Sequence, residues 1–237
     1  MSVENDCPDG VVETPDLRDR VGVFADRREA GEKLARLIEN YAGADALVLG
    51  IPAGGVPVAA ALADALDLEL DVAVVSKITL PWNPEAGYGA VAFDGTVRLN
   101  EPLIDRLSLG TEDVESGIEA TREKVRRRVR ELRGDGPLPS VEGRTVILVD
   151  DGLASGFTMM TAIDAVGGGN PAWMAVAVPT APLTSIESIV DDVDCVYCCN
   201  IRTGLRFAVA SAYRHWYDVS LREVQQLLRE HWNGEED

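Results

Sequence analysis

The chain has 237 residues, so it is long enough for one large domain or two small ones. Because 46% of its residues are hydrophobic, it is not a disordered protein. Its formal net charge of −18 repels nucleic-acid phosphates, which argues against a nucleic-acid partner. The acids are spread along the whole chain and only three lysines occur, a composition typical of a salt-adapted, halophilic protein. No apolar run approaches 18 residues, and we therefore expect no membrane span.

The beginning of the chain has neither the basic segment nor the apolar segment of a secretory signal, so we predict a cytoplasmic protein. Residues 1–16 contain prolines and a glycine but little periodicity. We expect them to form a flexible leader, followed by a single domain over residues 17–237.

Predicted strands and helices alternate along the rest of the chain. Apolar residues at helical spacing predict a first helix over residues 26–41, with Asp26 as its N-cap. Further helices are predicted over residues 56–66, 111–133, 157–166, 183–190 and 220–232, and strands over residues 46–51, 70–78, 146–149, 173–178 and 193–199. A hairpin over residues 90–100 is predicted to turn at Asp94 and Gly95. The alternation indicates an α/β fold with a parallel sheet flanked by helices.

Three of the four cysteines crowd into one short segment, as Cys195, Cys198 and Cys199. The spacing of the first two is compatible with zinc or redox chemistry. A zinc site needs about four ligands, however, and the chain has only two histidines. We therefore predict that these three cysteines are structural thiols in a core strand.

The segment over residues 145–158 carries the strongest functional signal. A continuous apolar strand runs into two acids, Asp150 and Asp151, and then into a loop of mostly small or hydroxylated residues. The loop residues are Gly152, Leu153, Ala154, Ser155, Gly156, Phe157 and Thr158. Backbone amides in such a loop can close on an anion at the positive end of the following helix. A phosphate site beside two carboxylates suits a ribose 5-phosphate.

Other interpretations of this segment explain less of it. An ordinary turn followed by a helix cap accounts for Asp, Gly and Ser, but it does not need all of these residue types in this order after a buried strand. A Walker A loop would require a Gly-Lys-Ser/Thr sequence, which is absent, and a dinucleotide-binding loop would require a Gly-x-Gly start.

The segment resembles the signature of the type I phosphoribosyltransferases, and every signature position is matched. The resemblance, which is greatest for a little-characterised prokaryotic branch, implies a hood region, a C-terminal helix and a role in nucleotide metabolism. It implies that 5-phosphoribosyl-1-pyrophosphate (PRPP) and Mg²⁺ bind, with Asp150 and Asp151 as the metal and ribose ligands. The loop from Gly152 to Thr158 would hold the 5′-phosphate.

The same resemblance implies a pyrophosphate loop after the first core strand, formed here by Ala53, Gly54 and Gly55. In the family this loop often contains a non-proline cis peptide and a basic residue, whose place Ala53 takes. We assign Lys77, predicted to lie at a strand end, to the pyrophosphate as a catalytic residue. Residues 79–89 resemble the mobile loop that closes over the reacting centre.

The acceptor site is less well defined. Phe207, after the last core strand, is a candidate for stacking on an acceptor base, although the aromatic residues of this region could equally pack against the C-terminal helix. The basic run from Arg126 to Arg128 is interpreted as a solvated helix face rather than a phosphate site.

The resemblance thus implies a phosphoribosyltransferase that acts on an unidentified small-molecule nucleophile, with a nucleobase as one candidate, and that could be a homodimer. Two alternatives remain open. One is a non-catalytic regulatory binder of PRPP or a nucleotide, which Ala53 favours. The other is a hydrolase of a phosphorylated sugar.

Overall fold

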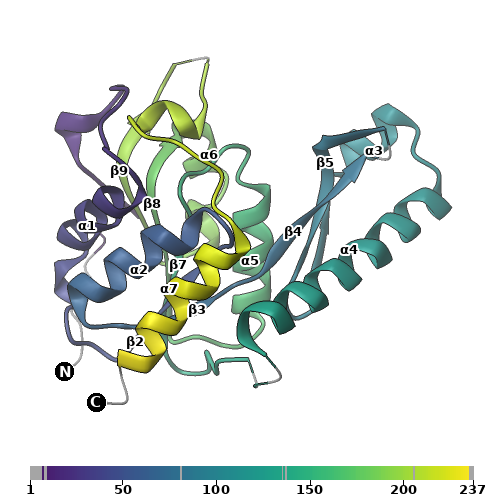
Figure 1. The fold of residues 1–237 in the computed structure, drawn as a ribbon. Coiled ribbons are helices and arrows are strands. Elements are labelled where there is room, and N and C mark those ends of the chain that lie inside the picture. Colours follow the sequence, from purple (N-terminus) through teal and green to yellow (C-terminus); the bar gives the residue numbers. More distant parts are fainter. Residues whose placement is uncertain are drawn as a thin grey trace.

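A computed structural model of the chain contains two sheets, a large parallel one and a small antiparallel one (Figure 1). It describes residues 7, 10–80, 82–134, 136, 138–204 and 206–234. The α/β class, with a parallel sheet flanked by helices, is confirmed. None of the described helices is long and apolar enough to cross a lipid bilayer.

The large sheet has six parallel strands in the order β1-β9-β8-β7-β2-β3. Their bounds are Val11–Glu13 for β1, Ala46–Gly50 for β2, Glu69–Val72 for β3, Thr145–Val149 for β7, Trp173–Pro182 for β8 and Cys195–Arg202 for β9. The central strands are buried on both faces, which explains their nearly unbroken apolar sequences.

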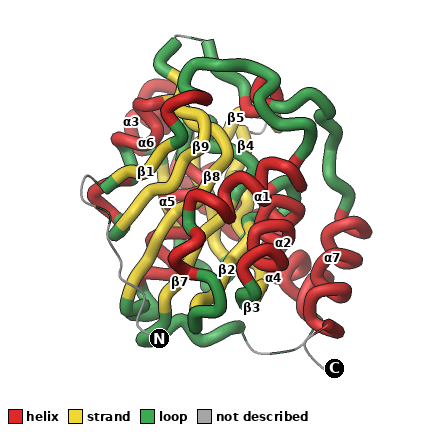
Figure 2. The backbone as a smooth tube through the Cα atoms, turned by 90° about the vertical axis from the view of Figure 1, so that its left-hand side faces the viewer, coloured by secondary structure: helices red, strands yellow, loops and turns green. Residues whose placement is uncertain are grey.

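Helices cover both faces of this sheet (Figure 2). Helices α1 (Arg27–Leu37), α2 (Gly55–Leu66) and α7 (Leu221–Gly234) pack together on one face, and α5 (Phe157–Gly167) and α6 (Leu183–Glu187) lie on the other. Alternate residues of the strands point to opposite faces of the sheet and so belong to two hydrophobic cores. Val48 and Ile147 belong to the first core, whereas Leu47 and Leu148 belong to the second.

The small sheet forms an arm that projects from the main body (Figure 1). Its antiparallel strands are β4 (Val75–Leu80), β5 (Asn83–Ala92) and β6 (Val97–Leu99), followed by α3 (Glu101–Leu107) and the long helix α4 (Thr111–Arg133). The predicted hairpin turn is confirmed, since the Asp94 carboxylate accepts a hydrogen bond from the Thr96 amide at 2.9 Å. Helix α3 was not predicted from the sequence.

Two predictions for residues 70–78 are wrong. The single strand expected over residues 70–78 is split between β3 and β4, which belong to different sheets. Lys77 therefore lies within β4, paired with Ala90, instead of at a strand end. Residues 79–89, expected to form a mobile loop, are largely paired between β4 and β5, apart from Pro81, which lies outside the described residues. Their closure over a reacting centre stays a prediction. Residues 70–76 are all buried, across the end of β3 and the start of β4, so the sequence pattern gives no sign of the break between the two strands.

The N-terminal predictions also need correction. Residues 11–13, assigned to the flexible leader, form edge strand β1 and pair with β9. Cys195 is a disulfide partner of Cys7 and not a thiol. Cys198 and Cys199 are buried free thiols in β9, as predicted, and burial raises the pKa of Cys199 to about 12. Such thiols stay protonated at neutral pH, which fits a structural role.

The C-terminal end of α4 is fixed to the main sheet by a buried ion pair. Arg133 donates two hydrogen bonds to the two carboxylate oxygens of Asp71 in β3, each 2.7 Å long. The side chains of Arg133 and Asp71 are only 11% and 8% exposed. Gln225 of α7 also donates to the Glu131 carbonyl at 2.7 Å. The last turns of α4 are therefore held against both β3 and α7.

We predict that Arg133→Met lowers the free energy of unfolding by roughly 3–5 kcal/mol, because it leaves the Asp71 carboxylate buried without its guanidinium. Urea unfolding at fixed salt measures this loss. Arg127→Met is the matched control on the same helix, since Arg127 pairs with the exposed Glu131 carboxylate at 3.9 Å, and should change stability by less than about 1 kcal/mol. Equal losses in the two variants would contradict the structural role of the Asp71 pair.

Candidate functional site

The candidate site lies where strands β2 and β7 end side by side. These strands are neighbours in register, with Gly50 beside Val149. The chain leaving β2 enters α2 on one face of the sheet, whereas the chain leaving β7 enters α5 on the other. Such a switch point leaves a crevice at the carboxyl ends of the strands, where α/β proteins bind their ligands. The Pro52–Gly55 loop and Asp150 meet here for this reason.

A cavity of about 390 Å³ opens at this point. Its walls come from the ends of β2 and β7, the loop before α5, strand β4 and helix α4. The charged residues that line it are Asp150, Lys77, Lys124 and Arg128. The cavity thus lies between the main sheet and the arm, and its walls carry more cations than acids.

The whole loop from Gly152 to Thr158 lines the cavity. Gly156 takes the left-handed conformation, with φ of 74°, at the N-terminus of α5, a conformation that favours glycine. The Leu153 amide donates to the Thr180 carbonyl at 3.0 Å and so is not free for a ligand. Ser185 donates to the Ala154 carbonyl at 2.6 Å, which fixes the loop.

The backbone amides that follow Leu153 are available to a ligand. The amides of Ala154, Ser155 and Gly156 donate no hydrogen bond to any described part of the chain, and the first amides of α5 have no intrahelical partner. Ala154 and Ser155 are located at the cavity wall, where Ser155 is exposed. This arrangement of free amides at a helix N-terminus suits a phosphate.

Asp150 is the one acid that lines the cavity among the described residues. Its Oδ1 accepts a hydrogen bond from the Asp151 amide at 2.8 Å. Burial raises the pKa of Asp150 well above its ordinary value and the Asp151 carboxylate raises it further, while that amide, Arg27 and Lys77 oppose the shift. A ligand hydroxyl or a cation beside Asp150 would stabilise its charged form.

Asp151 lies differently from Asp150 and does not line the cavity. Its Oδ2 accepts a hydrogen bond from Nε of Arg27 in α1 at 2.9 Å, and Nη2 of Arg27 lies 2.8 Å from the same oxygen in an ion pair. Arg27 is only 4% exposed. Burial raises the pKa of Asp151, and Arg27 opposes that shift. The predicted pair of equivalent acids is therefore one open carboxylate and one carboxylate engaged by a buried arginine.

The C-terminal segment encloses Arg27. The Arg27 guanidinium carbon lies 4.0 Å from the Trp216 ring centroid, and Nη1 donates to the Tyr217 carbonyl at 2.9 Å. Tyr213 donates from its hydroxyl to the Asp151 carbonyl at 2.6 Å. These aromatic residues hold the arginine and the acidic turn together, rather than packing only against the C-terminal helix.

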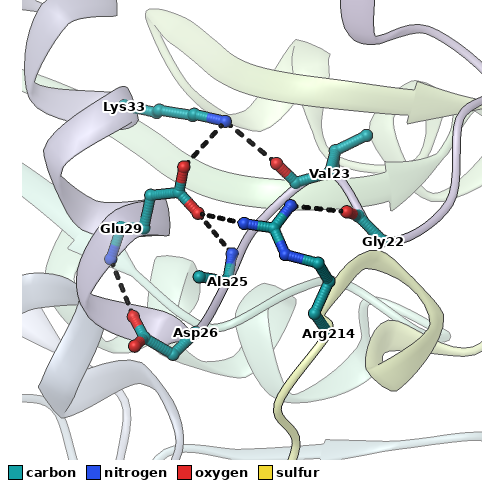
Figure 3. Close-up of polar contacts among 7 residues, drawn as sticks. All are labelled: Gly22, Val23, Ala25, Asp26, Glu29, Lys33 and Arg214. Atoms are coloured by element: carbon teal, nitrogen blue, oxygen red, sulfur yellow. Dashed lines mark hydrogen bonds and ion pairs between the residues drawn. The ribbon is translucent and has the colours of Figure 1, made fainter.

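A polar cluster fixes the start of α1 (Figure 3). Arg27 is the first residue of this helix. Asp26 caps the helix by accepting from the Glu29 amide at 3.0 Å, and Glu29 accepts in turn from the Ala25 amide. Lys33 donates to the Val23 carbonyl at 2.9 Å, and Arg214 pairs with Glu29 at 3.3 Å. The N-cap predicted at Asp26 is confirmed, and this cluster sets the position of Arg27.

The loop over residues 52–55 is tightly packed against the acidic turn. A Cβ atom on Gly54 would lie 2.0 Å from Asp151 Oδ2, and one on Gly55 would lie 2.6 Å from the Val149 carbonyl oxygen. The expected non-proline cis peptide is confirmed at Pro52–Ala53. The Gly55 amide donates to the Ile51 carbonyl at 3.0 Å, which counts against its use by pyrophosphate. Of this loop, only Pro52 lines the cavity.

The residues that line the cavity differ in part from those predicted from the sequence. Lys77 lines the cavity as expected, but Phe207 is half-buried and does not line it. Arg128, predicted to lie on a solvated face, lines the cavity together with Lys124. Spacing alone places Lys124 and Arg128 on one face of a helix, but nothing local in the sequence predicts that this face lines a cavity with the Gly152–Thr158 loop. Arg27 was also missed.

A magnesium ion fits the donor set if a ligand completes it. Asp150 and Asp151 supply the carboxylate oxygens that Mg²⁺ prefers. In the described part of the chain, no group of three or more His, Cys, Asp or Glu residues could hold a metal. Mg²⁺ is commonly held by one or two carboxylates together with substrate phosphates and water. The residues present therefore suit a metal that arrives with a phosphorylated substrate.

We predict that Gly54→Ala disrupts the site, because the new Cβ would overlap the Asp151 carboxylate, which Arg27 prevents from moving. The free energy of unfolding should fall by roughly 1–3 kcal/mol. Gly167→Ala is the control, since its Cβ would meet only Met174 at 3.9 Å in a helix. It should be neutral or stabilising. Chemical unfolding of both variants tests the packing, and an unchanged Gly54→Ala variant would argue against it.

Comparison with known proteins agrees with this geometry. The family model described as "Phosphoribosyl transferase domain" matches residues 94–212. A crystal structure of the TT1426 protein from Thermus thermophilus is 33% identical, with a TM-score of 0.71, and the match covers 87% of this chain and 98% of that one. Two Mycobacterium tuberculosis proteins, from strains CDC 1551 and H37Rv and each named "Putative phosphoribosyl transferase", are 34% identical over 211 residues. The match covers 87% of this chain but only 46% of theirs, so the chain spans about half the length of these relatives. The chain belongs to the phosphoribosyltransferase family.

Proposed function

We propose that the protein transfers a phosphoribosyl group from PRPP to a small-molecule nucleophile, with Mg²⁺ bound to the donor. The observation that carries this proposal is that the Gly152–Thr158 loop and Asp150 line one cavity together with Lys77. The loop suits a phosphate, Asp150 suits the ribose hydroxyls, and Lys77 suits a leaving pyrophosphate. The acceptor is not assigned, and a nucleobase remains one candidate.

In this proposal the free amides after Leu153 and the hydroxyls of Ser155 and Thr158 bind the 5′-phosphate. Asp150 accepts hydrogen bonds from the ribose hydroxyls, directly or through metal-bound water. Asp151, engaged by Arg27, orients the turn and keeps one carboxylate oxygen for the ribose or the metal. These contacts fix the ribose ring with its C1 atom open to an acceptor.

During transfer, the bond between C1 and the pyrophosphate oxygen breaks, positive charge develops on the sugar, and the nucleophile forms the new bond to C1. Asp150 favours the positively charged sugar by its negative charge, and Lys77 stabilises the departing oxygens. Mg²⁺, when bound, would neutralise charge on the pyrophosphate. No protein nucleophile is required.

A regulatory binder of PRPP is the second candidate function. Ala53 favours it, because a basic residue in the loop over residues 52–55 is what the resemblance to the type I family leads one to expect. A binder of this kind would use the same phosphate loop and Asp150 but would not release pyrophosphate.

We predict that the two acids respond differently to amide substitution. Asp150→Asn should keep the fold and weaken PRPP binding about 10- to 150-fold, because it loses charged hydrogen bonds worth about 1.5–3 kcal/mol. Asp151→Asn should also lower the free energy of unfolding, by about 1–3 kcal/mol, because it weakens the partner of the buried Arg27. Calorimetry and urea unfolding measure the two effects. Wild-type PRPP affinity in Asp150→Asn would remove this residue from the ribose site.

The function itself is tested by a turnover screen with PRPP, Mg²⁺ and a panel of bases and non-base nucleophiles in high salt. Pyrophosphate release that depends on one acceptor would identify a transferase. Tight PRPP binding without release would identify the regulatory binder instead. Release of ribose 5-phosphate without an acceptor would identify a hydrolase, and failure to bind PRPP would reject the proposal.

A further inference from the structure

Two cations of the arm face the candidate site. Lys124 and Arg128 are one helical turn apart on α4 and both line the cavity. No ion pair joins either of them to another residue that the structure describes. Neighbouring arginines of the same helix do pair with glutamates: Arg122 with Glu119, Arg126 with Glu119 and Glu123, and Arg127 with Glu131.

The charge of this cavity is opposite to that of the whole chain. Lys77, Lys124 and Arg128 line it against a single acid of the described chain, Asp150, in a protein whose formal net charge is −18. Two of the chain's three lysines are found here. Cations gathered in a concave site, with abundant acids elsewhere but few beside them, create a local potential that attracts anions. The cavity therefore has more positive charge than one 5′-phosphate in the amide loop requires.

The Pro52–Gly55 loop offers little to a second phosphate group. Ala53 brings no charge, the Gly55 amide is bonded to Ile51, and Gly54 is pressed against Asp151. The amides of Ala53 and Gly54 donate no hydrogen bond to the described residues, but their own loop contains no cation. A diphosphate needs stronger neutralisation than two neutral donors give.

We propose that Lys124 and Arg128 of α4 bind the diphosphate group of the donor, together with Lys77, and so replace the basic residue that the Pro52–Gly55 loop lacks. This inference rests on the proposed function and assigns its leaving-group site to the arm. The position of α4 makes the assignment possible, because Arg133, five residues beyond Arg128, is tied to Asp71 of the main sheet. The two cations are thereby held at a fixed place beside the cavity.

The test compares two double variants with the same change of charge on the same helix. Lys124→Met/Arg128→Met removes the cavity cations, and Arg126→Met/Arg127→Met removes cations that pair with glutamates on the helix surface. Calorimetry with inorganic pyrophosphate, PRPP and ribose 5-phosphate, at fixed Mg²⁺ and salt, measures affinity. We expect the first variant to lose about tenfold or more in affinity for pyrophosphate and PRPP, and less than about twofold for ribose 5-phosphate. The control should bind all three as wild type does.

Three results would overturn the assignment. Unchanged pyrophosphate and PRPP affinity in the first variant would mean that the cations serve another anion, such as an acidic acceptor. An equal loss for ribose 5-phosphate would place them at the 5′-phosphate. An equal loss in the control would mean that the loss of affinity comes from the change in overall charge.

The proposed function can fail independently of this subsite. If the wild type binds pyrophosphate through Lys124 and Arg128 but does not bind PRPP, the subsite stands and the proposed donor is wrong. Circular dichroism and unfolding midpoints confirm that both variants are folded.

Discussion

The site depends on one buried ion pair, between Arg27 and Asp151. It joins three parts of the chain that are far apart in sequence: the start of α1, the turn after β7 and the segment that contains Tyr213 and Trp216. A buried guanidinium is costly unless its donors and its charge are satisfied, and here a carboxylate, a carbonyl and an aromatic face satisfy them. Because Gly54 packs directly on the same carboxylate, the pair also sets the distance between the two loops at the switch point.

This pair makes two neighbouring acids chemically different. Asp151 is engaged by a cation inside the protein, whereas Asp150 lines the cavity beside Lys77, whose charge acts on it only through space. Burial raises the pKa of both, but only Asp151 has a hydrogen-bonded arginine that opposes the shift. Asp150 is thus the acid that gains most from a bound cation or from ligand hydroxyls. A motif of two adjacent aspartates gives no sign of this asymmetry, because the arginine that creates it is more than a hundred residues away in the chain.

The sequence was sufficient for the parts of the site that are continuous in the chain. The strand, the acids and the glycine-containing loop over residues 145–158 are local, and the alternating pattern of elements indicated the parallel sheet. Contacts between distant elements were not predictable in this way. The run of arginines on α4 shows no difference between Arg126, which pairs with glutamates, and Arg128, which lines the cavity. The division of residues 70–80 between two sheets could not be predicted either, because the residues on both sides of the break are buried.

The arm matters to the site because two ion pairs attach it to the main body. Arg133 of α4 is paired with Asp71 of β3, and Arg98 of β6 is paired with Asp164 of α5 at 2.8 Å. The first pair is buried and the second is about one-third exposed, so salt should screen the second more strongly. An arm held at two points keeps the cations of α4 at the cavity wall, opposite the Gly152–Thr158 loop, without first having to fold over a ligand. In the proposed reaction, less ordering would then be required when the donor binds, and preorganised charges of this kind would act on the leaving group without reorganising.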